Sequence, residues 1–331
     1  IYSHQQVIFG VSIMTEIILG VEIGGTKLQL GLGTPSGDIL EVQKTTVTVE
    51  NGSMGIRNWL EENVPLMISL AKERYGSVKG LGCGFGGPIN SDEGRVLKSI
   101  QIKGWRDFPI REWLQDTFLL PALVINDSNA ATWGEYKKGF GRGCEHFFYT
   151  NIGSGVGGGF VFGSRLFEGQ GFGAGEFGHC LVPDWRSEAP AAVEEIENLC
   201  SGWAIESRLN EPGYVPWDSS LYSDGSQITA ADLGKAARKG DPFALKEIDR
   251  VASSIGMGLA NVLCLTNVER IAIGGGVSNM GNLLIEPIKS YTKRYAFSIY
   301  QGKYKISKCL LGDSIVLVGS IMLANQFLGI S

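Results

Sequence analysis

The regular part of the chain begins with two apolar stretches separated by a glycine-rich turn. Residues 17–23 are mostly apolar, residues 24–27 read Gly-Gly-Thr-Lys, and residues 28–32 alternate leucine with glutamine or glycine. Alternation with a period of two is typical of a strand, and glycine is common in the tight turn between two strands. The pattern therefore predicts a β-hairpin over residues 17–32.

The same analysis predicts alternating strands and helices over the rest of the chain. Strands are expected at residues 41–49, 78–85, 122–125 and 270–273, and helices at residues 55–75, 105–117, 130–138, 230–238, 242–265, 282–295 and 319–328. Strands that alternate with helices indicate an α/β protein with a mixed sheet.

The hairpin pattern occurs a second time. Residues 147–162 again read as an apolar strand, a glycine turn at residues 153–155 and an alternating strand. Two halves that each begin with a glycine hairpin predict a duplicated fold with a ligand between the halves.

The repeat also predicts how the chain is divided. We expect a small α/β domain over residues 14–125 and a large α/β domain over residues 126–315, with a C-terminal helix at about residues 316–331 that returns to the first domain. Residues 1–13, which precede Met14, are interpreted as an upstream extension or a cloning remnant.

Two glycine clusters match the pattern G-x-G-x-x-G, at residues 82–87 and 153–158. A dinucleotide site requires a helix directly after the glycines. A proline follows the first cluster and alternating apolar residues follow the second, so neither is expected to be such a site. A glycine hairpin can still bind phosphate through its exposed backbone N–H groups, although each cluster taken alone is also compatible with a plain turn.

Composition narrows the classes of function. The chain has 331 residues, a net charge of −5 and no cluster of lysine and arginine, which argues against a nucleic-acid surface. It has no stretch of apolar residues long enough to span a membrane. The six cysteines contain no Cys-x-x-Cys pair, which favours reduced thiols and a cytoplasmic location over disulfides.

Five segments, in their order and spacing, resemble the motifs of the ROK family of sugar kinases and repressors. They are residues 20–27 (Gly-Val-Glu-Ile-Gly-Gly-Thr-Lys), 125–131 (Ile-Asn-Asp-Ser-Asn-Ala-Ala), 153–159 (Gly-Ser-Gly-Val-Gly-Gly-Gly), 175–179 (Gly-Glu-Phe-Gly-His) and 273–277 (Ile-Gly-Gly-Gly-Val). The resemblance extends over nearly the whole chain from Met14. It implies the actin-like, ribonuclease-H-like ATPase fold, with two lobes, a mixed sheet in each and a deep cleft between them.

The resemblance also implies the residues that bind ATP and a sugar. ATP would contact two phosphate hairpins, formed by Gly24, Gly25, Thr26 and Lys27 and by Gly153, Ser154 and Gly155, and its adenosine would lie beside Gly274, Gly275 and Gly276; the sugar would contact Asn126, Asp127, Glu176, His179 and Glu197. Mg²⁺ is expected on the phosphates, and no protein ligand is assigned to it.

Asp127 is the predicted catalytic base. A sugar hydroxyl is a poor nucleophile, so phosphoryl transfer requires in-line positioning, a metal on the phosphates and a carboxylate that takes the proton. The alternative for Asp127 is a purely structural one, as the N-cap of the helix that follows. Both roles are compatible, because a carboxylate at a helix N-terminus is stabilised in its ionised form.

The chain departs from the family pattern at three places. The zinc loop that many relatives carry after the histidine is missing, since Cys180 and Cys200 cannot replace its three thiolates, so no structural zinc is expected. Glu22 stands where the family more often has aspartate. Gln101 stands where relatives often have a sugar-binding asparagine, and it is predicted to contact the sugar.

The resemblance leaves several functions open. The first choice is phosphorylation of glucose by ATP, and kinases for fructose, mannose, allose or an N-acetylhexosamine are alternatives. Polyphosphate in place of ATP is also open. A sugar-sensing regulator without catalysis is the lesser alternative, because only sixteen residues precede the first predicted strand. A homodimer or homotetramer is expected from the resemblance.

Overall fold

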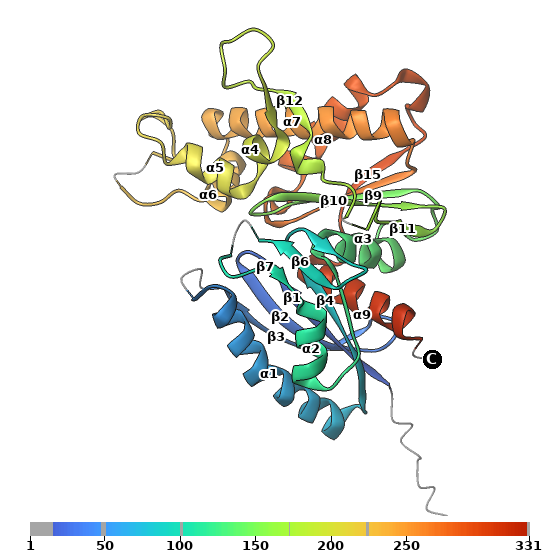
Figure 1. Ribbon diagram of the computed structural model, residues 1–331. Helices are drawn as coiled ribbons and strands as arrows, with labels where there is room; N and C mark the ends of the chain where they lie inside the picture. The colour runs from blue at the N-terminus through green and yellow to red at the C-terminus, as the bar shows by residue number, and fades with distance from the viewer. Residues whose placement is uncertain (1–15, 48–50, 100–101, 172, 223–224, 330–331) are drawn as a thin grey trace, which may run out of the picture.

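The computed structural model describes residues 16–47, 51–99, 102–171, 173–222 and 225–329. Within these ranges, strands and helices form two mixed sheets with helices packed against them (Figure 1). The prediction of an α/β fold with a mixed sheet in each half is confirmed.

The first sheet has the strand order β3-β2-β1-β4-β8. Its strands are β1 (Ile17–Ile23), β2 (Lys27–Gly33), β3 (Ile39–Thr46), β4 (Val78–Phe85) and β8 (Ala122–Asn126). Strands β1, β2 and β3 are antiparallel neighbours, whereas β4 runs parallel to both β1 and β8. The predicted hairpin over residues 17–32 is therefore present as β1 and β2.

Alternate residues of β1 face opposite sides of the first sheet. Leu19 belongs to the core formed with α1 (Gly52–Arg74) and α2 (Ile110–Phe118), whereas Ile18 packs with residues of α9 (Ile315–Leu328). Both side chains are fully buried. This explains why the strand is apolar on both faces rather than alternating.

The second sheet repeats the first, with the order β11-β10-β9-β14-β15. Its strands are β9 (Phe147–Ile152), β10 (Val156–Phe162), β11 (Arg165–Phe167), β14 (Arg270–Gly274) and β15 (Lys305–Lys308). Again three antiparallel strands are followed by two parallel ones. The duplication predicted from the two glycine hairpins is present in the strand order and directions of both sheets.

Helices enclose the second sheet on two sides (Figure 1). Phe148 packs into a core with α7 (Pro242–Thr266) and α8 (Asn282–Tyr295), whereas Phe147 packs into a core with α3 (Asp127–Lys138). The remaining helices of this half are α4 (Ile196–Cys200), α5 (Gly202–Leu209) and α6 (Ala230–Arg238).

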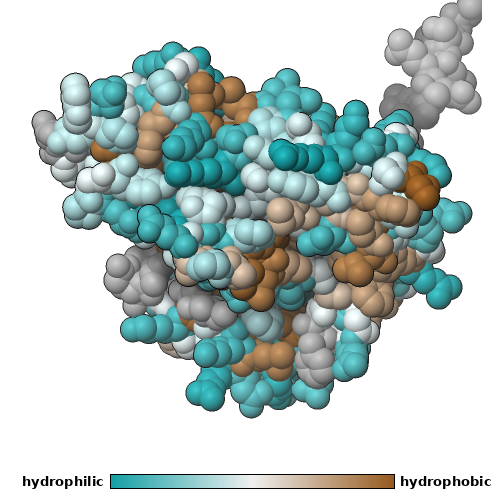
Figure 2. All heavy atoms as spheres, turned by 90° about the horizontal axis from the view of Figure 1, so that it is seen from above, coloured by the Kyte–Doolittle hydropathy of each residue, from teal (hydrophilic) through white to brown (hydrophobic). Residues whose placement is uncertain are grey.

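Among the described residues, α7 is long and apolar enough to cross a membrane by length and composition alone. However, 61% of its apolar window is buried inside the molecule, where it forms the core with α8. The face shown in Figure 2 is mostly hydrophilic, with apolar residues in scattered patches. The composition of α7 is therefore that of a core helix.

Helices α3 and α9 lie between the two sheets and pack closely. Helix α3 contacts β4 and β8 of the first sheet and β9 and β10 of the second. A Cβ atom added at Gly319 of α9 would lie 1.7 Å from the carbonyl oxygen of Ala130 in α3. Glycine is therefore required for the close approach of these two helices.

Two glycines of the first G-x-G-x-x-G match have the same role. A Cβ at Gly82 would lie 2.1 Å from the carbonyl oxygen of Ser320, and a Cβ at Gly84 would lie 2.4 Å from a methyl group of Val316. Both glycines lie inside β4, and no helix follows them directly. They allow α9 to pack on the sheet. This packing role agrees with the expectation that the first glycine cluster is not a dinucleotide site.

Several element boundaries differ from the prediction; α9, for example, begins at Ile315 rather than at residue 319. The helix predicted at residues 105–117 is a short strand, β7 (Arg106–Phe108), followed by α2. β7 pairs with β6 (Arg95–Lys98), which pairs with β5 (Ile89–Asn90). The helix predicted to begin at Ala130 begins at Asp127, so the three residues that precede Ala130 form its first turn.

Candidate active site

The first turn of α3 is fixed by Asn126, the N-cap residue. Its Oδ1 accepts hydrogen bonds from the backbone N–H groups of Ser128 at 2.9 Å and Asn129 at 3.1 Å. Its Nδ2 donates to the carbonyl oxygen of Gly87 at 3.2 Å, which ties the helix to the loop after β4. Asn126, rather than Asp127, is therefore the N-cap, and the structural alternative proposed for Asp127 is wrong in that detail.

The carboxylate of Asp127 lies beside the first glycine hairpin. A Cβ atom at Gly86 would lie 3.2 Å from Asp127 Oδ2 and 3.4 Å from the Cα atom of Gly24. Oδ1 accepts a hydrogen bond from the backbone N–H of Ser128 at 2.7 Å, and the residue is half-buried. One carboxylate oxygen is thus held by the helix, and the other is directed toward the hairpin.

Burial raises the pKa of Asp127 above its ordinary value, and the negative charge of Glu176 raises it further, whereas hydrogen bonds from Ser128 oppose the shift. Glu22 of β1 behaves in the same way. Burial raises its pKa from 4.5 to about 7 against the opposing charge of Lys27, and the charge of Asp127 adds to the rise. A carboxylate with a raised pKa is a better proton acceptor, which suits a catalytic base.

Ser128 connects the same helix to the second glycine hairpin. Its Oγ donates to Oδ1 of Asn151 at 3.0 Å, at the end of β9. A Cβ atom at Gly157 of β10 would lie 2.2 Å from Ser128 Oγ. The first turn of α3 therefore lies between the two hairpins, with Asp127 toward one and Ser128 toward the other.

The first hairpin closes through a hydrogen bond from the backbone N–H of Gly24 to the carbonyl oxygen of Lys27 at 2.8 Å. Lys27 Nζ lies 3.1 Å from the carboxylate of Glu22 and donates to the carbonyl oxygen of Asp313 at 2.9 Å. Gln29 also donates to Glu22. The cation thus lies at the turn, while Gly25 and Thr26 form its tip.

The second hairpin is supported from behind. Its turn closes by a hydrogen bond from Gly153 N to the carbonyl oxygen of Gly155 at 2.8 Å, and Gly153 accepts a bond from the backbone N–H of Gly202 at 2.7 Å, at the start of α5. Trp203 N donates to the carbonyl oxygen of Ser154 at 3.4 Å. The backbone of the turn is therefore held by hydrogen bonds from the start of α5.

The third glycine cluster lies directly against the second hairpin. Gly275 has φ of +83°, and a Cβ atom there would lie 2.4 Å from the carbonyl group of Ile152. Gly274 ends β14, and Gly276 begins a short 3₁₀ helix. Only glycine fits at residue 275, because both the backbone angle and the available space exclude a side chain.

The predicted sugar residues lie on a turn and a short helix beside this hairpin. Glu176 precedes the 3₁₀ helix Phe177–His179, and the side chains of both Glu176 and His179 are exposed. Glu197 lies in α4, and its Oε2 accepts a hydrogen bond from the backbone N–H of Val156 at 2.7 Å. That bond attaches α4 to the first residue of β10.

These contacts place Asn126, Asp127, Glu176, Glu197 and the three glycine clusters in one continuous region. Gln101 lies outside the described residues. Three side chains in the region, Ser128, Asn151 and Glu195, had no assigned role in the sequence analysis. Ser128 and Asn151 link the hairpins, and Glu195 contacts His179.

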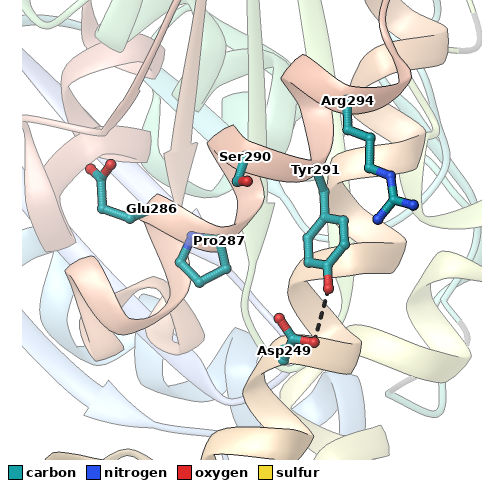
Figure 3. A pocket seen from close by; sticks show the side chains of 6 residues that line it. All are labelled: Asp249, Glu286, Pro287, Ser290, Tyr291 and Arg294. Atoms are coloured by element: carbon teal, nitrogen blue, oxygen red, sulfur yellow. Dashed lines mark hydrogen bonds between the residues drawn. The ribbon is translucent and has the colours of Figure 1, made fainter.

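The described part of the chain has no group of three or more His, Cys, Asp and Glu side chains placed to share a metal ion. A hollow of about 480 Å³ lies elsewhere, between α7 and α8 (Figure 3). Asp249 and Arg294 line it, and Tyr291 donates to Asp249 at 2.9 Å. No predicted site residue lines this hollow.

Comparison with known proteins gives relatives of similar length. The chain is 31% identical to a glucokinase from Halalkalibacterium halodurans over 93% of this chain and 94% of that protein. It is 30% identical to a glucokinase from Thermotoga maritima over 94% of this chain and 98% of that protein. A solved structure of a ROK family glucokinase from Streptomyces griseus, in complex with glucose and AMPPNP, has a TM-score of 0.79 and 29% identity, over 94% of this chain and 99% of that one.

The sequence model of one family, described as the ROK family, matches residues 18–327. That match includes both glycine hairpins, the start of α3 and the third glycine cluster. The chain belongs to the ROK family.

Proposed function

We propose that this protein is an ATP-dependent sugar kinase that transfers the γ-phosphoryl group of ATP to a hydroxyl of a hexose, with glucose as the first choice. The observation that carries the proposal is the position of Asp127. Its carboxylate lies at the start of α3, beside the first glycine hairpin, while the next residue contacts the second half of the molecule. The two glucokinases and the neighbouring structure with glucose and AMPPNP support the same activity.

Asp127 acts as the general base. The sugar hydroxyl oxygen forms a bond to the γ-phosphorus, the bond between that phosphorus and the β–γ bridging oxygen breaks to release ADP, and the hydroxyl proton passes to Asp127. The raised pKa of Asp127 favours this proton transfer. The remainder of the catalysis is positioning and neutralisation of phosphate charge.

The two hairpins bind the phosphates of ATP. Backbone N–H groups in the turns at residues 24–27 and 153–155 provide anion-binding concavities, and Lys27 adds a positive charge. Residues 274–276 border the adenosine, since they lie directly against the second turn. In this proposal the phosphates of the donor lie at the ends of β1 and β9, where the repeat brings its two equivalent turns.

The site also fits Mg²⁺ on the phosphates. Glu22 is a buried carboxylate whose pKa is raised to about 7, and a nearby cation would favour its ionised form. Glu22 would contact the metal through water, and the metal would neutralise charge on the transferred group. Within the protein, Glu22 and Lys27 set the charge of the first hairpin.

The sugar is bound by Asn126, Asp127, Glu176, His179 and Glu197, and Gln101 remains predicted as a further contact. Carboxylates and amides suit a hexose because each can pair with a hydroxyl in a defined direction. Fructose, mannose, allose and N-acetylhexosamines remain alternatives, as does a sugar-sensing regulator without catalysis. A homodimer or homotetramer and a cytoplasmic location also remain predictions.

A coupled assay of ADP release over a panel of hexoses tests the proposal. We expect ATP consumption that depends on the sugar, with the highest kcat/KM for glucose. A higher kcat/KM for another hexose would make that hexose the proposed substrate in place of glucose, and the proposed kinase activity would stand. Sugar binding without ATP consumption would instead favour the regulator and overturn the proposed reaction.

A further inference from the structure

The hairpin β12–β13 joins the predicted sugar-binding turn to α4. Its strands are β12 (Leu181–Pro183) and β13 (Val193–Glu195), which are antiparallel, with Leu181 opposite Glu195. The ladder ends with a hydrogen bond from the backbone N–H of Ile196 to the carbonyl oxygen of Cys180 at 3.0 Å. His179 and Glu195 therefore lie together at the open end of this hairpin.

The side chains of these two residues are in contact. Nδ1 of His179 lies 3.2 Å from Oε2 of Glu195, with the imidazole 52% and the carboxylate 37% exposed. A carboxylate next to Nδ1 accepts a hydrogen bond from it, so the proton of a neutral imidazole is held on Nδ1. Nε2 is then left with a lone pair and can accept a hydrogen bond.

We infer that Glu195 is a positioning residue for the sugar site. It holds the ring of His179 in the tautomer and orientation in which Nε2 accepts a hydrogen bond from a sugar hydroxyl. This inference rests on the proposed function, because it takes the sugar as the partner of Nε2. The contact between His179 and Glu195 is a separate observation and can be tested on its own.

Side-chain hydrogen bonds hold the hairpin close to Glu195. Arg186, at its turn, donates to Asp184 at 2.9 Å and to Glu194 at 2.7 Å. Asn198 of α4 also donates to Glu194, at 3.0 Å. These bonds hold β13 at Glu194, the residue before Glu195. They therefore limit the positions that the Glu195 carboxylate can take.

Trp185 attaches the hairpin to the helices behind it. The guanidinium groups of Arg208 in α5 and Arg250 in α7 each lie 5.0 Å from its ring. The indole N–H donates to Ser254 Oγ at 3.1 Å. Cation–π contacts combined with a hydrogen bond hold a ring in one place.

Both arginines are in turn paired with Glu247, which is almost fully buried. Arg250 lies 2.6 Å and Arg208 3.7 Å from its carboxylate. These ion pairs form within the protein, so they anchor the hairpin independently of any ligand. The segment that carries Glu195 is thus supported at its far end.

The end of the hairpin next to α4 is supported as well. Glu195 is the N-cap residue of α4, and Glu197, two residues later, accepts a hydrogen bond from Val156 N. One short segment therefore contacts His179 on one side and the start of β10 on the other. This arrangement connects the orientation of the imidazole to the second glycine hairpin.

The kinetic test compares Glu195→Ala, Glu195→Gln and Glu194→Ala with the unchanged protein. Glu195→Ala should raise the KM for the sugar about tenfold, as expected for loss of one hydrogen-bonded contact, with kcat and the KM for ATP within about threefold. Glu195→Gln should stay within about threefold, because its amide oxygen also accepts from Nδ1–H. Glu194→Ala, which loses bonds that hold β13 but keeps the carboxylate of Glu195, should lower Tm and raise the sugar KM by less than Glu195→Ala does.

The double variant His179→Ala with Glu195→Ala completes the cycle. If Glu195 acts through His179, the double variant has the sugar KM of His179→Ala alone. An additional rise in the double variant, or equal sugar KM values for Glu195→Ala and Glu194→Ala, would overturn the positioning role.

A second readout is independent of kinase activity. ¹⁵N NMR of labelled histidine reports which ring nitrogen carries the proton, and the chain has only 3 histidines, so His179→Ala assigns the signal. We expect the Nδ1–H form in the unchanged protein and in Glu195→Gln, and a mixture of tautomers in Glu195→Ala. An Nε2–H form in the unchanged protein would refute the inference even if the kinase is active, whereas an Nδ1–H form in a protein that phosphorylates no sugar would refute only the proposed function.

Discussion

Ser128 Oγ lies 3.0 Å from Asn151 Oδ1, so a side-chain hydrogen bond joins the first turn of α3 to the strand that enters the second glycine hairpin. Ser128 is buried, and its neighbour Asp127 faces the first hairpin. The proposed base is thus fixed relative to both predicted phosphate-binding turns.

Removing this bond should weaken the coupling between α3 and β9. We expect Ser128→Ala and Asn151→Ala each to lower the free energy of unfolding by about 1 kcal/mol, the usual net value of one hydrogen bond. In a double-mutant cycle measured by denaturant unfolding, the coupling energy should be about 0.5–1.5 kcal/mol. Strict additivity of the two substitutions would show that the bond does not contribute.

The close approach of α3 and α9 makes a second prediction. Gly319→Ala should lower the free energy of unfolding by at least about 3 kcal/mol, because the added methyl group would meet the Ala130 carbonyl oxygen. Gly234→Ala in α6 is the matched control, since its new methyl group would meet the flexible side chain of Met280 at 3.2 Å. There, the better helix propensity of alanine should leave stability equal or higher. Similar losses for both variants would contradict the packing argument.

The packing of these glycines shows what the sequence could and could not reveal. The hairpin β1–β2 was predictable because a glycine turn between two strands is a local signal. The role of Gly82 was not, because its reason is the carbonyl oxygen of Ser320, far away along the chain. A glycine required for close packing looks the same in sequence as one required for a ligand.

The start of α3 was predicted three residues too late from the sequence, for a related reason. Asn126, Asp127, Ser128 and Asn129 all favour caps and turns, so the propensities alone did not identify the first helical residue. In the structure, Asn126 caps the helix through Oδ1 and also donates from Nδ2 to the carbonyl oxygen of Gly87. Glu195 was missed because a glutamate among other glutamates resembles a solvated helix face, and only the β12–β13 pairing brings it to His179.

The raised pKa of Glu22 gives a third prediction, which concerns how the free energy of unfolding depends on pH. In the folded protein this pKa is about 7, against 4.5 ordinarily, so the folded state retains a proton that the unfolded state loses between these values. Stability from Glu22 is therefore full below about pH 4.5 and is lost as the pH rises to about 7, by up to about 3 kcal/mol.

Unfolding of the unchanged protein and of Glu22→Gln without ATP measures this effect. The stability of the unchanged protein relative to the variant should fall as the pH is raised from about 5 to about 8. Glu61→Gln, on an exposed position of α1, is the control and should give the same difference at both values. A relative stability that rises with pH would show that Glu22 is ionised in the folded protein.

The fourth prediction concerns zinc. Elemental analysis of the purified protein should find no stoichiometric zinc, and a chelator should leave Tm unchanged. The physical reason is that the segment between His179 and Glu197 is held by the Trp185 and Arg186 contacts. Among the described residues, its cysteine, Cys180, belongs to no group of three or more His, Cys, Asp and Glu side chains that could hold a metal ion. One tightly bound zinc per chain would overturn this prediction.

The last prediction separates the catalytic from the structural role of Asp127. In Asp127→Asn, the helix start should survive because the N-cap is Asn126, whose Oδ1 holds the next two N–H groups. The amide keeps an oxygen that can accept the hydrogen bond from Ser128 N, so sugar binding should remain within about threefold. The variant cannot take a proton from the sugar hydroxyl, so kcat should fall about 10²- to 10⁴-fold. Steady-state kinetics, sugar titration by calorimetry and thermal unfolding measure the three quantities on one preparation. Turnover within about threefold of the unchanged protein corresponds to under about 1 kcal/mol of barrier and would exclude Asp127 as the base.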